Sequence, residues 1–181
     1  MPELTEKQRE RIALAAAVIE ETENASADEI ATLLSGACAN FLAELDALSE
    51  SQAAFSPGEG EWSVSEVCRH MSHAVRNTAL GIVALAQGMG PKEKKPVRMG
   101  VLDPDPGSFD AARQGVEEAF GACAGAIHAL EEEPDLKETI LHPYFGELNC
   151  RKLASFNLLH INVHVAQLQR IKSSKNFPSN S

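Results

Sequence analysis

The residues of this chain with the clearest chemical potential gather near its C-terminal end. His160 and His164 stand four positions apart, and Gln167 follows one turn later. On an ideal helical wheel of about 100° per residue, they share a face with apolar side chains lying within about 60° of His160. That face comprises Leu153, Phe156, His160, Val163, His164, Gln167 and Ile171. A helix buries such a face, and an unpaired polar group buried there costs on the order of 1–3 kcal/mol. The three polar side chains therefore need partners.

A His-x-x-x-His pair on one helical face places two imidazoles one turn apart, close enough to bind one metal ion. Taken alone the pattern is unspecific, because many such pairs are solvated or bonded to ordinary side chains. A third ligand has to come from another helix, and His70 and His73 are the candidates. His70 lies on the flank of its helix's apolar stripe and His73 nearly opposite it. The wheel favours His70 without deciding the matter, and predicts His73 at the surface.

Neighbouring polar side chains could orient these imidazoles. Asn157 and Gln167 share the inner side of the last helix and are the first candidates. Glu66 lies one turn before His70 and could contact it. The place of Glu66 in a capping motif at the start of that helix already explains it, so we expect the capping role.

The other histidines and the cysteines have simpler interpretations. Cys68 and Cys123 are predicted to be small core residues, because neither has a local basic partner that would favour a thiolate. His128 is expected to be a partly exposed helical residue. His142 precedes Pro143 and is expected to shape a turn rather than to bind metal.

Helical periodicity and capping signals define the elements that must position these side chains. Ser26 with Glu29, and Ser63 with Glu66, form capping boxes, and Trp62 with Val67 fits a hydrophobic staple. Five helices follow from these patterns, at about residues 5–21, 26–48, 63–87, 108–132 and 149–172.

The segment 89–107 contains four prolines and three glycines, so it is predicted to be irregular. A connection of this length can carry the chain back along a bundle, so that two successive helices run parallel. The fold class is therefore all-α, a four-helix bundle in up-down-down-up order with an additional N-terminal helix. Residues 1–25 form the N-terminal helical extension, 26–172 the bundle and 173–181 a flexible polar tail.

Composition limits the classes of partner. The net charge is −10 and no dense basic cluster occurs, so nucleic acid and anionic membrane surfaces are not expected as partners. No apolar run approaches the roughly 20 residues of a membrane span. The N-terminus lacks the layout of a signal peptide, and the four cysteines form no C-x-x-C pair, which favours the cytoplasm.

Two segments together resemble a known family. The first, Glu61 to Met71, contains a tryptophan, a capping serine, a glutamate and then a histidine on one helix, and resembles the first motif of the DinB/YfiT-like superfamily. The second, His142 to Leu148 followed by Phe156, His160, His164 and Gln167, resembles its C-terminal motif. The resemblance spans roughly residues 27–171. It implies an up-down-down-up bundle with a three-histidine metal site, in which His70, His160 and His164 match the ligands. The helix before Ala27 is an addition to the family core.

Three neutral imidazoles would leave a divalent ion its full charge and an open coordination position, the pattern of a catalytic site. Water or a thiol in that position would become a nucleophile at neutral pH. Imidazole ligands suit zinc, nickel, iron or copper, and we expect zinc or nickel.

Some relatives use such a metal to activate a low-molecular-weight thiol as cosubstrate, and others are described as metal-dependent hydrolases. The resemblance thus implies a thiol S-transferase or a hydrolase acting on a small molecule, with a non-catalytic metal-binding or stress-response module as the alternative. No catalytic residue beyond the ligands is singled out. The amphipathic N-terminal helix could serve a homodimer or pack on its own bundle.

Overall fold

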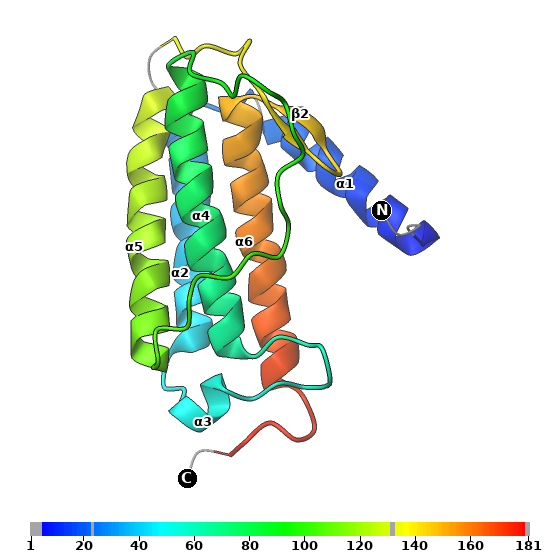
Figure 1. The fold of residues 1–181 in the computed structure, drawn as a ribbon, viewed down its shortest axis with the longest axis vertical. Helices are drawn as coiled ribbons and strands as arrows, with labels where there is room; N and C mark the ends of the chain where they lie inside the picture. Colours follow the sequence, from blue (N-terminus) through cyan, green and yellow to red (C-terminus); the bar gives the residue numbers. More distant parts are fainter. Residues whose placement is uncertain (1–4, 23, 131–132, 180–181) are drawn as a thin grey trace.

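Four long helices form the body of the molecule (Figure 1). The computed structural model describes residues 5–22, 24–130 and 133–179. The bundle consists of α2 (Ala27–Leu45), α4 (Val64–Ala86), α5 (Phe109–Ile127) and α6 (Cys150–Lys172). The helix α1 (Glu6–Thr22) packs on α6 at one end and projects away from the bundle at the other (Figure 1). Among the described residues, no helix combines the length and apolar character that crossing a membrane requires.

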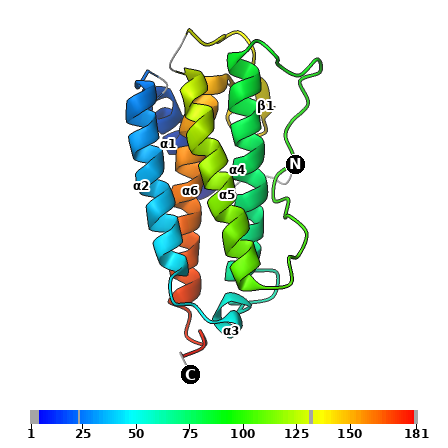
Figure 2. The same ribbon diagram turned by 90° about the vertical axis from the view of Figure 1, so that its left-hand side faces the viewer.

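The predicted up-down-down-up order is confirmed. In Figures 1 and 2, α2 and α6 run in one direction and α4 and α5 in the other. The two parallel helices are joined by the long connection after α4, which descends along the bundle before α5 begins. Backbone hydrogen bonds hold this connection against the bundle, so it can position side chains. The Val97 N–H donates to the Leu141 carbonyl at 3.0 Å, and the Asp103 N–H donates to the Arg69 carbonyl at 3.2 Å.

Local capping explains where the helices begin. The capping boxes at Ser26 and Ser63 are both present, with the serine accepting from the backbone of Glu29 or Glu66 and the glutamate accepting from the serine N–H. An N-cap of this kind contributes about 1 kcal/mol. Asn149 caps α6 by accepting from the Lys152 N–H at 2.9 Å.

Two predicted helix ends and one predicted loop differ from the structure. The second helix ends at Leu45 rather than Leu48, because Ala47 adopts a left-handed φ of 58°. The chain then forms the short helix α3 (Glu50–Ala53) in a segment predicted to be a loop. The third bundle helix, α5, ends at Ile127 and continues as a 3₁₀ turn, η1 (His128–Leu130), and its predicted end at Glu132 lies outside the described residues.

The segment before α6 contains two strands that the sequence did not reveal. β1 (Ile140–His142) pairs antiparallel with β2 (Gly146–Leu148), and the predicted turn at 142–146 is the tip of this hairpin. The strands are only three residues long, too short for a period-two pattern to show. After α6, the Phe177 ring packs edge-on against Phe55, and Pro178 accepts a hydrogen bond from Gln52 at 2.9 Å. The flexibility of the tail stays a prediction.

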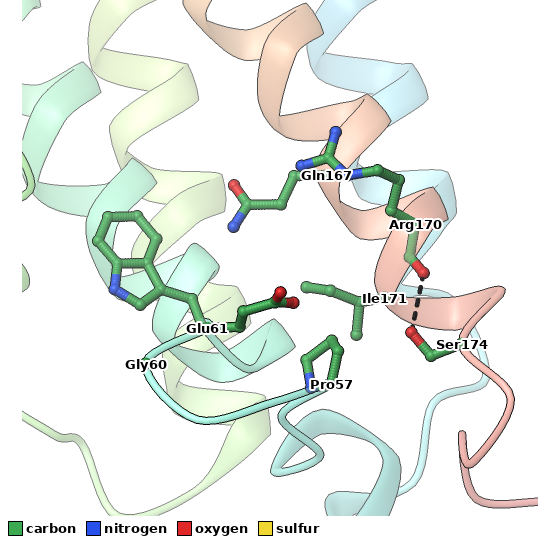
Figure 3. Close-up of a pocket in the computed structure, with 8 residues that line it drawn as sticks. Pro57, Gly60, Glu61, Gln167, Arg170, Ile171 and Ser174 are labelled. Atoms are coloured by element: carbon green, nitrogen blue, oxygen red, sulfur yellow. Dashed lines mark hydrogen bonds between the residues drawn. The ribbon is translucent and has the colours of Figure 1, made fainter.

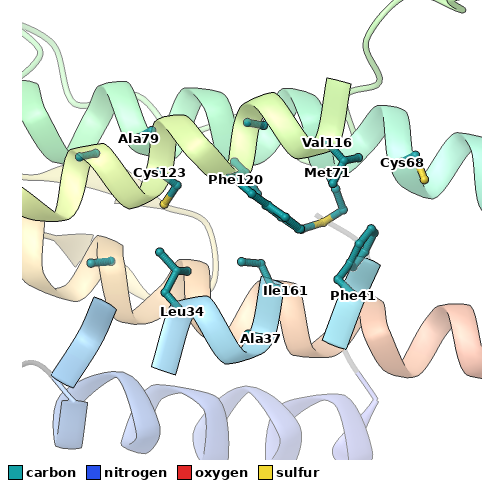
Figure 4. Close-up of a cluster of buried hydrophobic side chains, with 14 of the residues drawn as sticks. Leu34, Ala37, Phe41, Cys68, Met71, Ala79, Val116, Phe120, Cys123 and Ile161 are labelled. Carbon is teal, nitrogen blue, oxygen red and sulfur yellow. The ribbon is translucent and has the colours of Figure 1, made fainter. Parts of the chain in front are cut away.

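The core fills the space between the four helices (Figure 4). Phe41 of α2 and Phe120 of α5 meet edge-to-face with ring centroids 5.5 Å apart. On α6 the buried stripe differs from the predicted one. It contains Asn157, Ile161, His164, Leu168 and Ile171, whereas Val163 is 54% exposed. The wheel was centred on His160, but that side chain lies at the edge of the buried face, so the true face is rotated away from Val163.

Candidate metal centre

The structure brings together the three histidines to which the family motifs point. His70 comes from α4, and His160 and His164 come from α6. The Nε2 atom of His160 lies 3.2 Å from Nε2 of His70 and 3.0 Å from Nε2 of His164. All three ligand atoms fall within 4.8 Å of one another. Nitrogens bound tetrahedrally at a metal–nitrogen distance of about 2.0–2.1 Å are separated by about 3.3 Å, so the spacing is close to that of a metal site.

Hydrogen bonds behind the rings fix the direction of two lone pairs. His70 donates from Nδ1 to the Val101 carbonyl at 2.9 Å, and His164 donates from Nδ1 to Oε1 of Gln167 at 2.7 Å. A carbonyl oxygen only accepts, so both protons are on Nδ1 in the neutral rings and both Nε2 atoms carry lone pairs. Those lone pairs point toward the third imidazole, where one proton could satisfy only one of them. This donor set fits a single cation at its centre.

Burial keeps the triad neutral at physiological pH. Desolvation lowers the pKa of His70 below its usual value and lowers the pKa of His164 to about 4. Desolvation is also the main cause that lowers the pKa of His160 far below its usual range, and the neighbouring imidazoles add to it. A metal competes with protons for imidazole nitrogen, so a low pKa favours ligation.

Two aromatic rings flank the triad. The Trp62 ring lies 4.9 Å from His70 and stacks on His164 at 6.3 Å between centroids. Phe156 stacks on His160 at 5.4 Å. The sequence predicted Trp62 as a helix staple and missed its place beside the ligands. It also missed Val101, because a backbone carbonyl on an irregular connection leaves no side-chain signal.

Several predicted roles can be checked against the contacts. Gln167 is in contact with the triad as expected. Asn157 is not: its amide donates to Sγ of Cys123 at 2.9 Å, within the core. Asn157 thus lies on the inner side of α6 as predicted, but it contacts the core and not an imidazole. Glu66 acts as the capping residue, and its Oε2 accepts from the Ser63 N–H at 2.8 Å.

The other histidines, Cys68 and Cys123 lie outside the triad. His73 lies partly exposed on α4, 3.3 Å from Asp103. His128 is exposed, and His142 accepts from the backbone of the turn as predicted. Cys68 and Cys123 are buried core residues, and desolvation raises their pKa to about 12 and about 11.

One cavity is lined by residues of the triad, and a second is lined by Trp62 and Gln167, which contact the triad. One, of about 530 Å³, is bounded by α4, α6, the long connection and the β1 strand, and His70 and His160 line it. The other, of about 500 Å³, is shown in Figure 3, where Glu61, Gln167 and Arg170 surround it, and Trp62 also lines it. Both volumes fall within the range of about 300–1,000 Å³ that is typical of small-molecule sites.

Comparison with known proteins identifies the family and supports the fold. The family model described as the DinB superfamily matches residues 33–168. A solved structure of YfiT from Bacillus subtilis matches with a TM-score of 0.63 and 13% sequence identity, covering 98% of this chain and 93% of that chain. That protein is described as a probable metal-dependent hydrolase with an unusual four-helix bundle topology. No curated protein sequence matches the chain.

Proposed function

We propose that this chain, which belongs to the DinB superfamily, is a metal-dependent enzyme acting on a small molecule, with one divalent ion held by His70, His160 and His164. The observation that carries the proposal is the convergence of three Nε2 atoms, two of them with the ring proton assigned to the opposite nitrogen. Such an ion would supply a Lewis acid and lower the pKa of water or a thiol in its open position.

The chain's own residues would hold the ligands and shape the space around them. The Val101 carbonyl and Gln167 fix the orientation of two imidazoles, a restraint that typically changes metal affinity 10- to 100-fold. Trp62 and Phe156 cover the rings with apolar surface and so limit the access of water. The cavity of about 530 Å³ leaves room for a substrate beside His70 and His160.

Two reactions suit this site. A hydrolase would use water as the nucleophile, and an S-transferase would use a low-molecular-weight thiol as cosubstrate against an electrophile. The description of YfiT as a probable metal-dependent hydrolase favours the first. Imidazole ligation suits zinc or nickel, which we propose as the metal.

The wider setting follows from charge and exposed surface. A net charge of −10 favours a small molecule over a nucleic acid as the partner. All four cysteines are free thiols, which fits the cytoplasm that we propose as its location. Leu14 and Val18 of α1 are exposed, and a second copy of the chain would cover them if the protein forms a homodimer.

Element analysis of the purified protein tests the ligand set. We expect about one zinc or nickel ion per chain, lost in His160→Ala. His128→Ala is the matched control, because it removes an exposed imidazole outside the triad and should retain the metal. Full metal retention in His160→Ala would contradict the proposal.

Activity requires a separate assay. The metal-loaded protein is tested against ester and amide substrates without thiol, and against electrophiles with bacillithiol, mycothiol or glutathione. Turnover without thiol identifies the hydrolase, and turnover that requires a thiol identifies the transferase. Full metal occupancy with no turnover in either panel would favour the non-catalytic metal-binding or stress-response module.

A further inference from the structure

The cavity of about 530 Å³ has a mostly apolar wall and one unusual polar group. Its lining includes Val97, Met99, Ile140, Leu153 and Phe156, contributed by the long connection, β1 and α6. His142, at the end of β1, lines the same cavity. The metal ligands do not account for this histidine, and the family match gives it no role.

The hydrogen bonds of His142 define its tautomer. Its Nδ1 accepts from the backbone N–H of Tyr144 at 3.2 Å and from that of Phe145 at 3.3 Å. A nitrogen that accepts carries no proton, so in the neutral ring the proton is on Nε2. The ring is also held by neighbours, since it stacks on Phe145 and contacts Phe156, each at 4.7 Å between centroids. His142 therefore presents a donor of fixed direction.

That donor has no acceptor among the described residues. The His142 side chain is 3% exposed, and Nε2 is buried without a hydrogen-bond partner. A buried donor left unpaired costs about 1–3 kcal/mol, so an acceptor that enters the cavity would recover this energy. His160 also lines this cavity, and its Nδ1 is likewise buried without a hydrogen-bond partner.

We propose that His142 is a substrate-positioning residue, whose Nε2–H donates a hydrogen bond to an oxygen of a mainly apolar small molecule bound in this cavity. The acceptor is a carbonyl or carboxylate oxygen. His70 and His160 line the same cavity, so the bound molecule lies beside the triad. Arg98 lies exposed at the cavity and would favour a carboxylate. The binding site itself does not depend on the proposed function. Only the statement that the bound molecule is a substrate rests on it.

The test uses the purified full-length chain, ¹⁵N-labelled, with its metal content measured. Acetophenone and α-methylstyrene form a matched pair, because a CH₂ group in the second replaces the carbonyl oxygen of the first. We expect acetophenone to bind about five- to tenfold more tightly. The resonance of the His142 Nε2 proton should also shift when acetophenone binds and stay in place with α-methylstyrene.

Two variants isolate the donor. His142→Asn keeps an acceptor oxygen near the position of Nδ1 for the turn but removes the Nε2–H, so the preference for acetophenone should disappear. His73→Asn removes another imidazole that lines the same cavity but is already paired with Asp103, so the preference should remain. Phenylacetate binding more tightly than phenylacetamide, with the difference lost in Arg98→Ala, would support a carboxylate. Equal binding of the two would support a neutral carbonyl.

Equal affinity of wild type for acetophenone and α-methylstyrene would overturn the proposal. So would a preference that survives in His142→Asn, or an Nε2 proton that no probe shifts, because a bound water would then satisfy the donor. A different result would contradict the proposed function alone. If the protein binds no metal but still prefers acetophenone, the proposed metal-dependent enzyme is rejected and the binding site at His142 is supported.

Discussion

The two sides of α6 bury polar groups in different ways. On the side that faces α4 and the long connection, three imidazoles converge within 4.8 Å, and the cavity of about 530 Å³ lies against two of them. On the side that faces α2 and α5, Asn157 donates to Cys123 among apolar residues. The first side resembles a binding site whose side chains are held in place by hydrogen bonds, and the second resembles an ordinary helical core.

The difference shows how one helix serves both stability and chemistry. Ile161 and Leu168 are fully buried and anchor α6 in the core. His160 and His164 lie beside this stripe, so the packing that holds the helix also sets the positions of the imidazoles. If this division is real, core variants should change stability but not metal content, and site variants should do the reverse.

The largest expected effect is a loss of stability with the site intact. Phe41→Ala removes a fully buried ring that packs on Phe120. We expect the free energy of unfolding to fall by about 3–5 kcal/mol, measured by urea denaturation. The folded fraction should still bind the same amount of metal per chain. A proportional loss of metal in protein that is still folded would break the division between the two sides.

Acid should weaken the molecule through its buried histidines. Desolvation lowers the pKa of His142 from 6.5 to about 4, so the unfolded chain binds the proton more readily than the folded one. The resulting stability is complete above pH 6.5 and is lost as pH falls toward 4, by about 3 kcal/mol in total. Urea denaturation of wild type and His142→Asn between pH 7 and 4.5 should show a weaker pH dependence in the variant. Identical slopes would contradict the assigned burial.

How far the sequence anticipated this comparison depends on the kind of signal. Capping residues and periodicity are local, so the bundle order and the starts of α2, α4 and α6 were predictable. The wheel correctly indicated a buried His164 and a buried Asn157 but misplaced Val163, because the face that a helix buries is set by its neighbours. The Val101 carbonyl and the cavity walls depend on tertiary contacts with an irregular connection, which no local pattern encodes.

An intermediate effect should distinguish the restraint on a ligand from the ligand itself. Gln167→Ala removes the acceptor of the His164 Nδ1 proton. Metal affinity should fall about 10- to 100-fold, while the free energy of unfolding of the metal-free protein changes little because Gln167 is only partly buried. The measurement is a competition titration with a metal chelator. Gln169→Ala, which removes an exposed bond to Glu44, is the control and should leave the affinity unchanged. Equal affinities for both variants would mean that His164 is held by packing alone.

The smallest effect compares two capping boxes of the same design. Ser63→Ala and Ser26→Ala each remove the side-chain acceptor from a helix N-terminus, at α4 and α2 respectively. Each should lower the free energy of unfolding by about 1 kcal/mol, measured by urea denaturation. Ser63 is directly joined to Trp62 and starts the helix that carries His70, so fraying there disturbs both the ligand and the ring that covers it. Ser26 starts a helix that carries no ligand. Ser63→Ala should therefore lower metal affinity several-fold, whereas Ser26→Ala should not. If both variants lose affinity equally, the site responds to the stability of the whole bundle, and the two sides of α6 are not independent.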